Sequence, residues 1–347
     1  MVDSAKNAVS GAAFLTTLAI PAELAHARLG DTSVDTLVKM SQHQTAAGLV
    51  IQQNGQNEAC KVCIEANLKH SRVPRRRTRT NLRPLEIVGC DLQEYETVGW
   101  DGGKQLAVYV DHDTGFLATV VLKNKNDQER AAPDVIHRLE RISGRKIDIL
   151  RADQGGEYTS DAFRAQIRSM GIKLEYSDTA RAHQNGLAEV IGGKITRMMR
   201  AARVRSGVPR KYWSENARYQ TWIHNRVSLR RQFGLTTPLQ EMTGARTDVS
   251  RARVFGCEAW VLIRRNTKAK LDPRAERGVF LGVCHDKKAY RVLLWSSRKI
   301  IDSTDVVVFE KVFPFLDDSD PKAREAEVLN SASEDCVDGG SDADEHE

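Results

Sequence analysis

The sequence predicts an α/β protein whose central part is a mixed five-stranded sheet covered by helices. Three observations support this class. Strand-like and helix-like segments alternate between residues 84 and 206. Short amphipathic segments and a Cys-x-x-Cys pair precede that region, and short β-rich segments in close succession follow it. The length of 347 residues fits two or three domains.

Charge is distributed unevenly along the chain. Residues 317–347 carry twelve acidic side chains against Lys322 and Arg324, which gives −10; the whole chain carries +6, so residues 1–316 carry +16. A basic body is typical of proteins that bind polyanions, most often nucleic acid, although a basic protein without such a partner has the same composition. Residues 316–347 lack aromatic side chains and are predicted to be an acidic, disordered tail.

The cysteine content and the apolar runs indicate in which cellular compartment we expect the protein. A membrane-spanning helix needs a run of about 18 apolar residues. No apolar run in this sequence approaches that length, so we expect no membrane partner. Of six cysteines only Cys60 and Cys63 are close together, which favours a reducing intracellular compartment over a disulfide scaffold.

Residues 1–19 are left unassigned, and residues 20–70 are predicted to form a small helical module. Apolar side chains fall at spacings that suit short amphipathic helices at Leu24, Leu29, Val34, Leu37 and Met40. Cys60 and Cys63 have the spacing of many zinc sites, although a redox pair or coincidence has the same pattern. A structural zinc needs four ligands, so His26 is the first further candidate, followed by His43 and His70.

Residues 71–83 form a basic linker with six arginines and no acid. Such a run is often a solvated connection without a role, but its position also fits contact with phosphates. Under the second interpretation the candidate nucleic-acid contacts are Arg75, Arg76, Arg77 and Arg79.

Residues 84–245 are predicted to form the α/β core. The expected strands are "LEIVGCDLQ" ending at Asp91, two strands within residues 105–122 joined by a turn at "DHDTG", "KIDIL" and "IKLEYS". The expected helices are residues 129–143, a segment around 161–170, one beginning near Gly186, and further helix within 207–245.

Asp153 and Glu189 are the first candidates for a functional site. Asp153 follows a buried strand, and Glu189 follows "HQNG" where a helix begins. Carboxylates held on rigid elements indicate a cation site, because hard divalent cations prefer oxygen ligands. Asp91 also falls at the carboxyl end of an expected strand, where sites gather in α/β sheets. Asp111 and Asp113 compete as carboxylates but have the pattern of turn residues.

The helix that carries Glu189 is predicted to be amphipathic. Its inner side is expected to hold Ile191, Ile195, Met198, Met199 and Ala202. Its outer side is expected to hold the basic residues Lys194, Arg197, Arg200 and Arg203, a face that suits a nucleic-acid backbone or an ordinary solvated exterior. Gly192 and Gly193 together cost about 2 kcal/mol of helix propensity relative to alanine, which predicts a local weakness one turn from Glu189.

Residues 250–315 are predicted to form a small β-barrel. The expected strands are "VFGCEAWVLIR", "GVFLGV", "YRVLLWS", "KIIDS" and "DVVVFE".

Several of these blocks together resemble the integrases of copia-type LTR retrotransposons, in the retroviral integrase superfamily. "HARLGDTS" with "CKVC" is similar to the family's zinc module, and "LRADQGGEYTSDAF" and "HQNGLAEV" are similar to the blocks around two catalytic acids. "RVFGCEAWV", "KLDPRAERGVFLGV" and "YRVLLW" resemble its SH3-like segment. The resemblance spans about residues 20–315 and implies a ribonuclease H-like core between a zinc module and an SH3-like barrel.

The resemblance also implies a third carboxylate and a reaction. Asp91 occupies the family's first catalytic position; 61 residues separate it from Asp153, and 35 separate Asp153 from Glu189. The implied catalytic and Mg²⁺ (or Mn²⁺) residues are therefore Asp91, Asp153 and Glu189. Two cations roughly 4 Å apart would serve phosphodiester transfer, in which the 3′ ends of element DNA join target DNA.

Two positions depart from the family's usual residues. Asp31 stands where the family has its second zinc histidine, so the implied zinc set is His26, Asp31, Cys60 and Cys63. Gly192 and Gly193 stand where the family tends to have asparagine and arginine.

The expected partners are double-stranded DNA, as element ends and target, and further copies of the chain. The expected location is the nucleus, after a cytoplasmic particle stage. Two alternatives stay open: a decayed or co-opted nucleic-acid-binding protein without catalysis, which the departures favour, and a ribonuclease H-like nuclease or transposase, which would lack the zinc module.

Overall fold

The structure, a computed structural model, describes residues 19–52, 60–67, 82–176, 186–227, 235–263, 271–284 and 287–316. The predicted contacts Arg75, Arg76, Arg77 and Arg79, the candidate His70 and the acidic tail from residue 317 lie outside the described residues.

A mixed five-stranded sheet forms the centre of the molecule, as the sequence predicted. Its strands are β4 (Ile87–Glu94), β5 (Gln105–Asp111), β6 (Leu117–Leu122), β7 (Ile149–Ala152) and β8 (Lys173–Tyr176), in the order β6-β5-β4-β7-β8. The pairs β4–β5 and β5–β6 are antiparallel, whereas β4–β7 and β7–β8 are parallel. This sheet is of the kind implied by the ribonuclease H-like resemblance.

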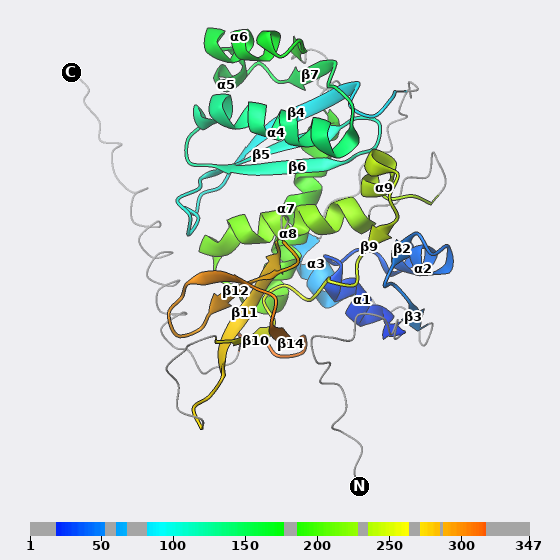
Figure 1. Ribbon diagram of the computed structural model, residues 1–347, viewed down its shortest axis with the longest axis vertical. Coiled ribbons are helices and arrows are strands. Elements are labelled where there is room, and N and C mark those ends of the chain that lie inside the picture. Colours follow the sequence, from blue (N-terminus) through cyan, green and yellow to red (C-terminus); the bar gives the residue numbers. More distant parts are fainter. Residues whose placement is uncertain are drawn as a thin grey trace, which may run out of the picture.

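Helices cover both faces of the sheet (Figure 1). One face packs against α4 (Asp127–Ser143) and α6 (Asp161–Ser169), and the other against α7 (Gly186–Ser206) and α8 (Trp213–Val227). The fully buried strand β5 accounts for this arrangement, because its alternate side chains enter different cores. Val108 and its neighbours two residues away pack with α7 and α8, whereas Ala107 and Tyr109 pack with α4 and α6.

The N-terminal module lies against α7 and α8. It contains α1 (Ala22–Arg28), α2 (Val34–Gln42) and α3 (Lys61–Asn67), with the short strands β1 (Ile20–Pro21), β2 (Ala46–Ala47) and β3 (Ile51–Gln52). Strand β2 pairs with β9 (Thr247–Asp248), so the module is also tied to the segment that follows the core. Leu37 and Met40 are fully buried, as their spacing predicted.

The short helix η2 (Arg210–Tyr212) lies between α7 and α8, and α9 (Pro238–Thr243) follows α8. The C-terminal strands β10 (Glu258–Leu262), β11 (Ala275–Val283), β12 (Tyr290–Leu294), β13 (Ile300–Ser303) and β14 (Val306–Phe309) form one antiparallel sheet. Its order is β13-β12-β11-β10-β14, and all five predicted strands are present. The β11–β12 register shifts between Phe280 and Gly282, an irregularity of the kind that bends a sheet.

One local expectation was wrong. Strand β4 does not end at Asp91 but continues to Glu94, because its antiparallel pairing with β5 extends to Glu94 opposite Gln105. Helix α7 runs without interruption through Gly192 and Gly193, where it packs against the sheet, and the weakness expected from the low helix propensity of glycine stays a prediction. The short helix α5 (Gly156–Thr159) was not anticipated.

No helix within the described ranges combines the length and the apolar character that crossing a membrane requires.

Candidate functional site

Asp91 and Asp153 lie opposite each other at the point where the parallel strands β4 and β7 separate. The last paired residues are Gly89 and Arg151, and each aspartate follows its strand's last pair by two positions. Side chains two residues apart on a strand share a face, so both aspartates project on the same side of the sheet. The parallel register therefore brings together two acids that 61 residues separate in the chain.

The Asp153 carboxylate is held by the loop that follows β7. Its Oδ1 accepts a hydrogen bond from the Gly155 backbone N–H at 3.0 Å. Helix α5 starts at the next residue, so Asp153 sits in a tight turn between a strand and a helix. The residue is exposed.

Glu189 lies in the first turn of α7 and is exposed. The next turn of the helix is anchored by Ile191 and Ile195, which are buried on the inner side as predicted. Residues 177–185, which include "HQN", lie outside the described ranges. The buried side of α7 packs against the sheet, and Glu189 lies at the exposed start of the same helix.

The pKa of Asp91 is affected both by its burial and by the neighbouring acids. Burial raises the pKa of Asp91, and the negative charges of Asp153, Glu189 and Glu157 raise it further, against a lowering hydrogen bond from the Leu92 backbone. Like charges raise a carboxyl pKa only when they are near, and a cation would relieve the repulsion.

Glu157, in the first turn of α5, was missed by the sequence reasoning. Its position four residues after Asp153 in "DQGGE" was the only available sign.

The three predicted acids are not part of the one compact group of potential metal ligands found among the described residues.

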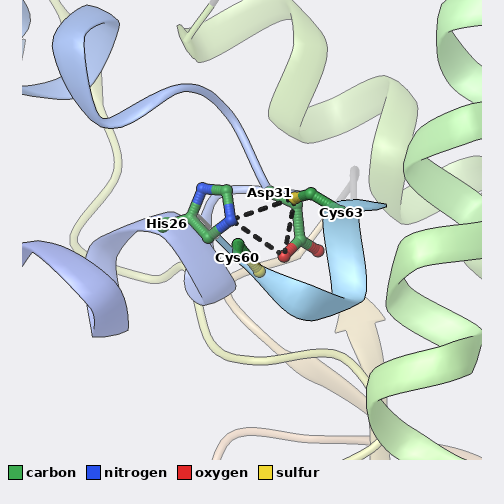
Figure 2. Close-up of side chains that lie close together, drawn as sticks. All are labelled: His26, Asp31, Cys60 and Cys63. Atoms are coloured by element: carbon green, nitrogen blue, oxygen red, sulfur yellow. Dashed lines mark hydrogen bonds and ion pairs between the residues drawn. The ribbon is translucent and has the colours of Figure 1, made fainter. Parts of the chain in front are cut away.

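That compact group consists of His26, Asp31, Cys60 and Cys63, the four residues implied as zinc ligands (Figure 2). His26 comes from α1 and Asp31 from the turn after it; Cys60 directly precedes α3, and Cys63 lies in its first turn. His26 Nε2 lies 3.2 Å from Cys63 Sγ and 3.3 Å from Asp31 Oδ1, and Cys63 Sγ lies 3.9 Å from Asp31 Oδ1. Zinc–ligand distances of 2.0–2.3 Å give tetrahedral edges of roughly 3.3–3.8 Å, so this spacing fits zinc.

The backbone around α1 orients two of the ligands. His26 Nδ1 lies 2.6 Å from the Thr32 carbonyl oxygen, to which it donates, so the Nε2 lone pair is left facing the centre. Asp31 has a φ of 53°, a left-handed conformation that aspartate tolerates better than most residues. Its Oδ2 is buried without a hydrogen-bond partner among the described residues, whereas Oδ1 is the oxygen that lies near His26 and Cys63.

Arg205, near the end of α7, is an unanticipated neighbour of this group. Its guanidinium pairs with Asp31 Oδ1, and its Nη2 lies 3.8 Å from Cys60 Sγ. Burial and the Asp31 charge raise the pKa of Cys63 to about 12, so without a metal that thiol stays protonated. Burial also raises the pKa of Cys60, but hydrogen bonds from the Cys63 backbone and His26 lower it overall.

The predicted basic face of α7 is only partly open to solvent. Arg200 is exposed, but its Nη1 donates to the Ala66 carbonyl oxygen at 2.8 Å and so joins α7 to α3. Lys194 and Arg197 are half-buried rather than outward, and burial, followed by the Arg197 charge, lowers the pKa of Lys194 to about 8.

Asp111 is not part of the acidic site. It is fully buried and accepts hydrogen bonds from the Leu85 N–H at 3.0 Å and the Thr114 N–H at 2.9 Å. These bonds hold the turn between β5 and β6, which is the role that the sequence favoured for it.

Comparisons with known proteins give relatives for most of the chain. The family profile "Retroviral polymerase SH3-like domain" matches residues 257–322. The chain is 29% identical over 321 residues to "Retrovirus-related Pol polyprotein from transposon TNT 1-94" of Nicotiana tabacum, which covers 90% of this chain and 23% of that protein. It is 25% identical to "Retrovirus-related Pol polyprotein from transposon RE1" of Arabidopsis thaliana, over 84% of this chain and 19% of that protein. The chain thus spans about a quarter or less of the length of these curated relatives.

Solved structures with a similar arrangement are more distant. One is the HTLV-2 integrase catalytic core domain in complex with magnesium, with a TM-score of 0.37 and 20% identity, covering 47% of this chain and 99% of that one. Another is a simian T-cell lymphotropic virus intasome in complex with PP2A regulatory subunit B56 gamma, with a TM-score of 0.42 and 14% identity, covering 73% and 86%.

Proposed function

We infer the function from a confirmed relationship: this chain is related to the retrovirus-related Pol polyproteins of plant transposons. We propose that it is a retrotransposon integrase, which joins the 3′ ends of element DNA to target DNA. A 3′-hydroxyl loses its proton and attacks a target phosphodiester; one P–O bond forms, and another breaks to release a 3′-hydroxyl on the target strand. The observation that supports the proposal is the parallel register of β4 and β7, which brings Asp91 and Asp153 to the same end of the sheet, against which the helix that carries Glu189 packs.

The three acids would divide the work of holding two divalent cations, Mg²⁺ or Mn²⁺. Asp91 and Asp153 would hold the first, and Asp91 and Glu189 the second. The bound pair would supply an activated oxygen nucleophile and charge neutralisation at the leaving oxygen. Asp91 suits the shared position because its carboxyl is partly buried and lies in the field of both other acids; burial first, and then their charges, raise its pKa. The Gly155 N–H keeps the Asp153 carboxylate oriented.

Zinc would belong to the N-terminal module. His26, Cys60, Cys63 and Asp31 offer one imidazole, two thiols and a carboxylate, a donor set that zinc accepts. There the ion would stabilise the fold rather than take part in the transfer reaction.

Double-stranded DNA is the proposed partner, and the charge of +16 over residues 1–316 supports it. Assembly into multimers on paired DNA ends and action in the nucleus, after a cytoplasmic stage, are parts of the same proposal.

The test is Mg²⁺-dependent joining of a short duplex DNA to plasmid by the purified chain. Asp153→Asn should abolish joining, because it removes a negative ligand while keeping the side-chain shape. Asp161→Asn is the matched control, since Asp161 is a fully exposed aspartate at the start of α6. Joining by the Asp153 variant at the wild-type rate would disprove the site assignment. DNA binding without joining by the wild type would favour the alternative, a nucleic-acid-binding protein without catalysis.

A further inference from the structure

Gly192 and Gly193 look equivalent in the sequence but have different surroundings in the structure. Gly192 is buried in the face of α7 that meets β4, and a Cβ added to it would lie 2.3 Å from Gln93 Nε2 and 3.1 Å from Gln93 Cδ. A Cβ added to Gly193 would meet only Arg197 Nη1, at an ordinary 3.7 Å. Gln93 thus occupies the space that a side chain at position 192 would need, whereas Gly193 leaves free space.

The Gln93 side chain makes polar contacts with Thr196 of α7 and with Tyr95, which directly follows β4. Its Oε1 lies 3.2 Å from the Thr196 hydroxyl and 3.4 Å from the Tyr95 hydroxyl, both of which can donate to it. The Thr196 hydroxyl also lies 3.2 Å from the Gly192 carbonyl oxygen. Tyr95 is fixed in turn by stacking on Trp213, with ring centroids 4.3 Å apart. We call Gln93, Tyr95, Gly192 and Thr196 the Gln93 clasp.

The Gln93 clasp lies next to two of the proposed catalytic acids. Gln93 follows Asp91 by two residues on β4, so both project on the same face of the sheet. Gly192 follows Glu189 by three residues on α7, so the two lie on neighbouring turns of one face. The clasp therefore joins the strand that carries Asp91 to the helix that carries Glu189.

We propose that Gln93 is a positioning residue that enters the space left by Gly192 and so sets the separation of Asp91 and Glu189. On this interpretation, Gly192 is not a sign of decay, because the space that its missing side chain leaves is filled by Gln93 from β4. The inference rests on the proposed function for its activity measurement, but its effect on cation binding can be measured independently.

The experiment compares Gly192→Ala with Gly193→Ala in the full chain, and measures Mn²⁺ affinity, Tm, and the kcat and KM of joining. Gly193→Ala should retain wild-type Mn²⁺ affinity and activity and raise Tm, because alanine favours the helix. Gly192→Ala should displace the Gln93 amide, weaken Mn²⁺ binding and lower kcat by roughly tenfold or more, with little change in the KM for DNA.

A double-variant cycle identifies Gln93 as the residue responsible. Gln93→Ala should weaken Mn²⁺ binding without adding any atom to the helix. Adding Gly192→Ala to Gln93→Ala should cause no further loss, because the clash that Gly192→Ala creates is with Gln93 itself. This arm also covers the case in which Gly192→Ala alone fails to fold.

Equal Mn²⁺ affinities for wild type, Gly192→Ala and Gln93→Ala would overturn the inference, whether or not the wild type joins DNA. Additive losses in the double variant would overturn it as well. If the wild type does not join DNA but the predicted differences in Mn²⁺ affinity appear, the proposed function fails while the positioning role of Gln93 holds.

Discussion

At Asp91, burial and neighbouring charge act in the same direction. The folded protein keeps a proton on this carboxyl to higher pH than the unfolded chain does, because burial and then the charges of Asp153, Glu189 and Glu157 raise its pKa. In the window between the two pKa values the unfolded state binds fewer protons, so stability falls as pH rises through it. Above the folded pKa, ionised Asp91 imposes its full electrostatic cost on the metal-free fold.

Replacing this carboxyl should therefore stabilise the metal-free protein. Asp91→Asn should unfold at higher urea concentration than wild type near pH 7.5 in EDTA, and its advantage should shrink as the pH falls toward the ordinary aspartate pKa of about 3.9. In Mg²⁺ the order should reverse, because wild type gains stability from a cation that the variant holds poorly. The measurement is urea denaturation across pH, with Asp161→Asn as the control that shows no such trend. A stability difference that does not vary with pH would contradict this account.

At the scale of elements, α7 connects the two candidate sites. Its first turn carries Glu189, and its last turns bind the N-terminal module through Arg200 on the Ala66 carbonyl and Arg205 on Asp31. The Asp31 side chain is only 3% exposed and that of Arg205 16%, so the ion pair is largely removed from solvent. Removing one partner of such a pair leaves the other charge without compensation.

Asp31→Asn should consequently weaken both the docking of the module and its metal site. We expect a loss of about 2 kcal/mol in the free energy of unfolding, because asparagine can accept a bond from Arg205 but carries no charge. Zinc per chain, measured after purification without chelator, should fall below that of wild type. Asp35→Asn, at an exposed aspartate on α2, should stay within about 0.5 kcal/mol. Wild-type protein that contains no zinc would rule out the metal site while leaving the ion pair to be tested by urea denaturation.

Local pattern was sufficient to predict some of these features and not others. The strands of the two five-stranded sheets, the buried side of α7 and the turn role of Asp111 follow from patterns within a few residues, and all were predicted, although the end of β4 was not. The pairing of Asp91 with Asp153 depends on strand register, which the sequence around either residue does not contain. Gln93 and Gly192 meet only because β4 packs against α7, so in the sequence alone the glycine pair looked like a defect. Asp31 and Arg205 likewise come from distant elements, so in the sequence Asp31 looked like an isolated substitution.

At the scale of the whole molecule, one apolar core joins the three parts of the chain. Buried residues from α1 and α2, from α7 and α8, and from the C-terminal sheet belong to a single cluster, as the neighbouring positions of these elements in Figure 1 also indicate. Ion pairs reinforce the same joints. Arg28 on α1 binds Glu310 just after β14, with Nε–O distances of 2.7 and 2.8 Å. We therefore expect one cooperative unfolding transition for the described parts.

Glu215 on α8 offers the sharpest test of that continuity. Its side chain is fully buried and binds Arg291 of β12 at 2.6 and 3.0 Å and Arg218 at 2.6 Å. Glu215→Gln should lower the free energy of unfolding by about 3 kcal/mol, because two partly buried guanidinium groups lose their shared counter-charge. Calorimetry should show a single transition that moves as a whole to lower temperature. Glu94→Gln, which affects an exposed pair with Lys125, should change stability by no more than about 1 kcal/mol. If Glu215→Gln instead separated the transition into two, the C-terminal sheet would fold independently of α8, and the shared core would contribute little to cooperativity.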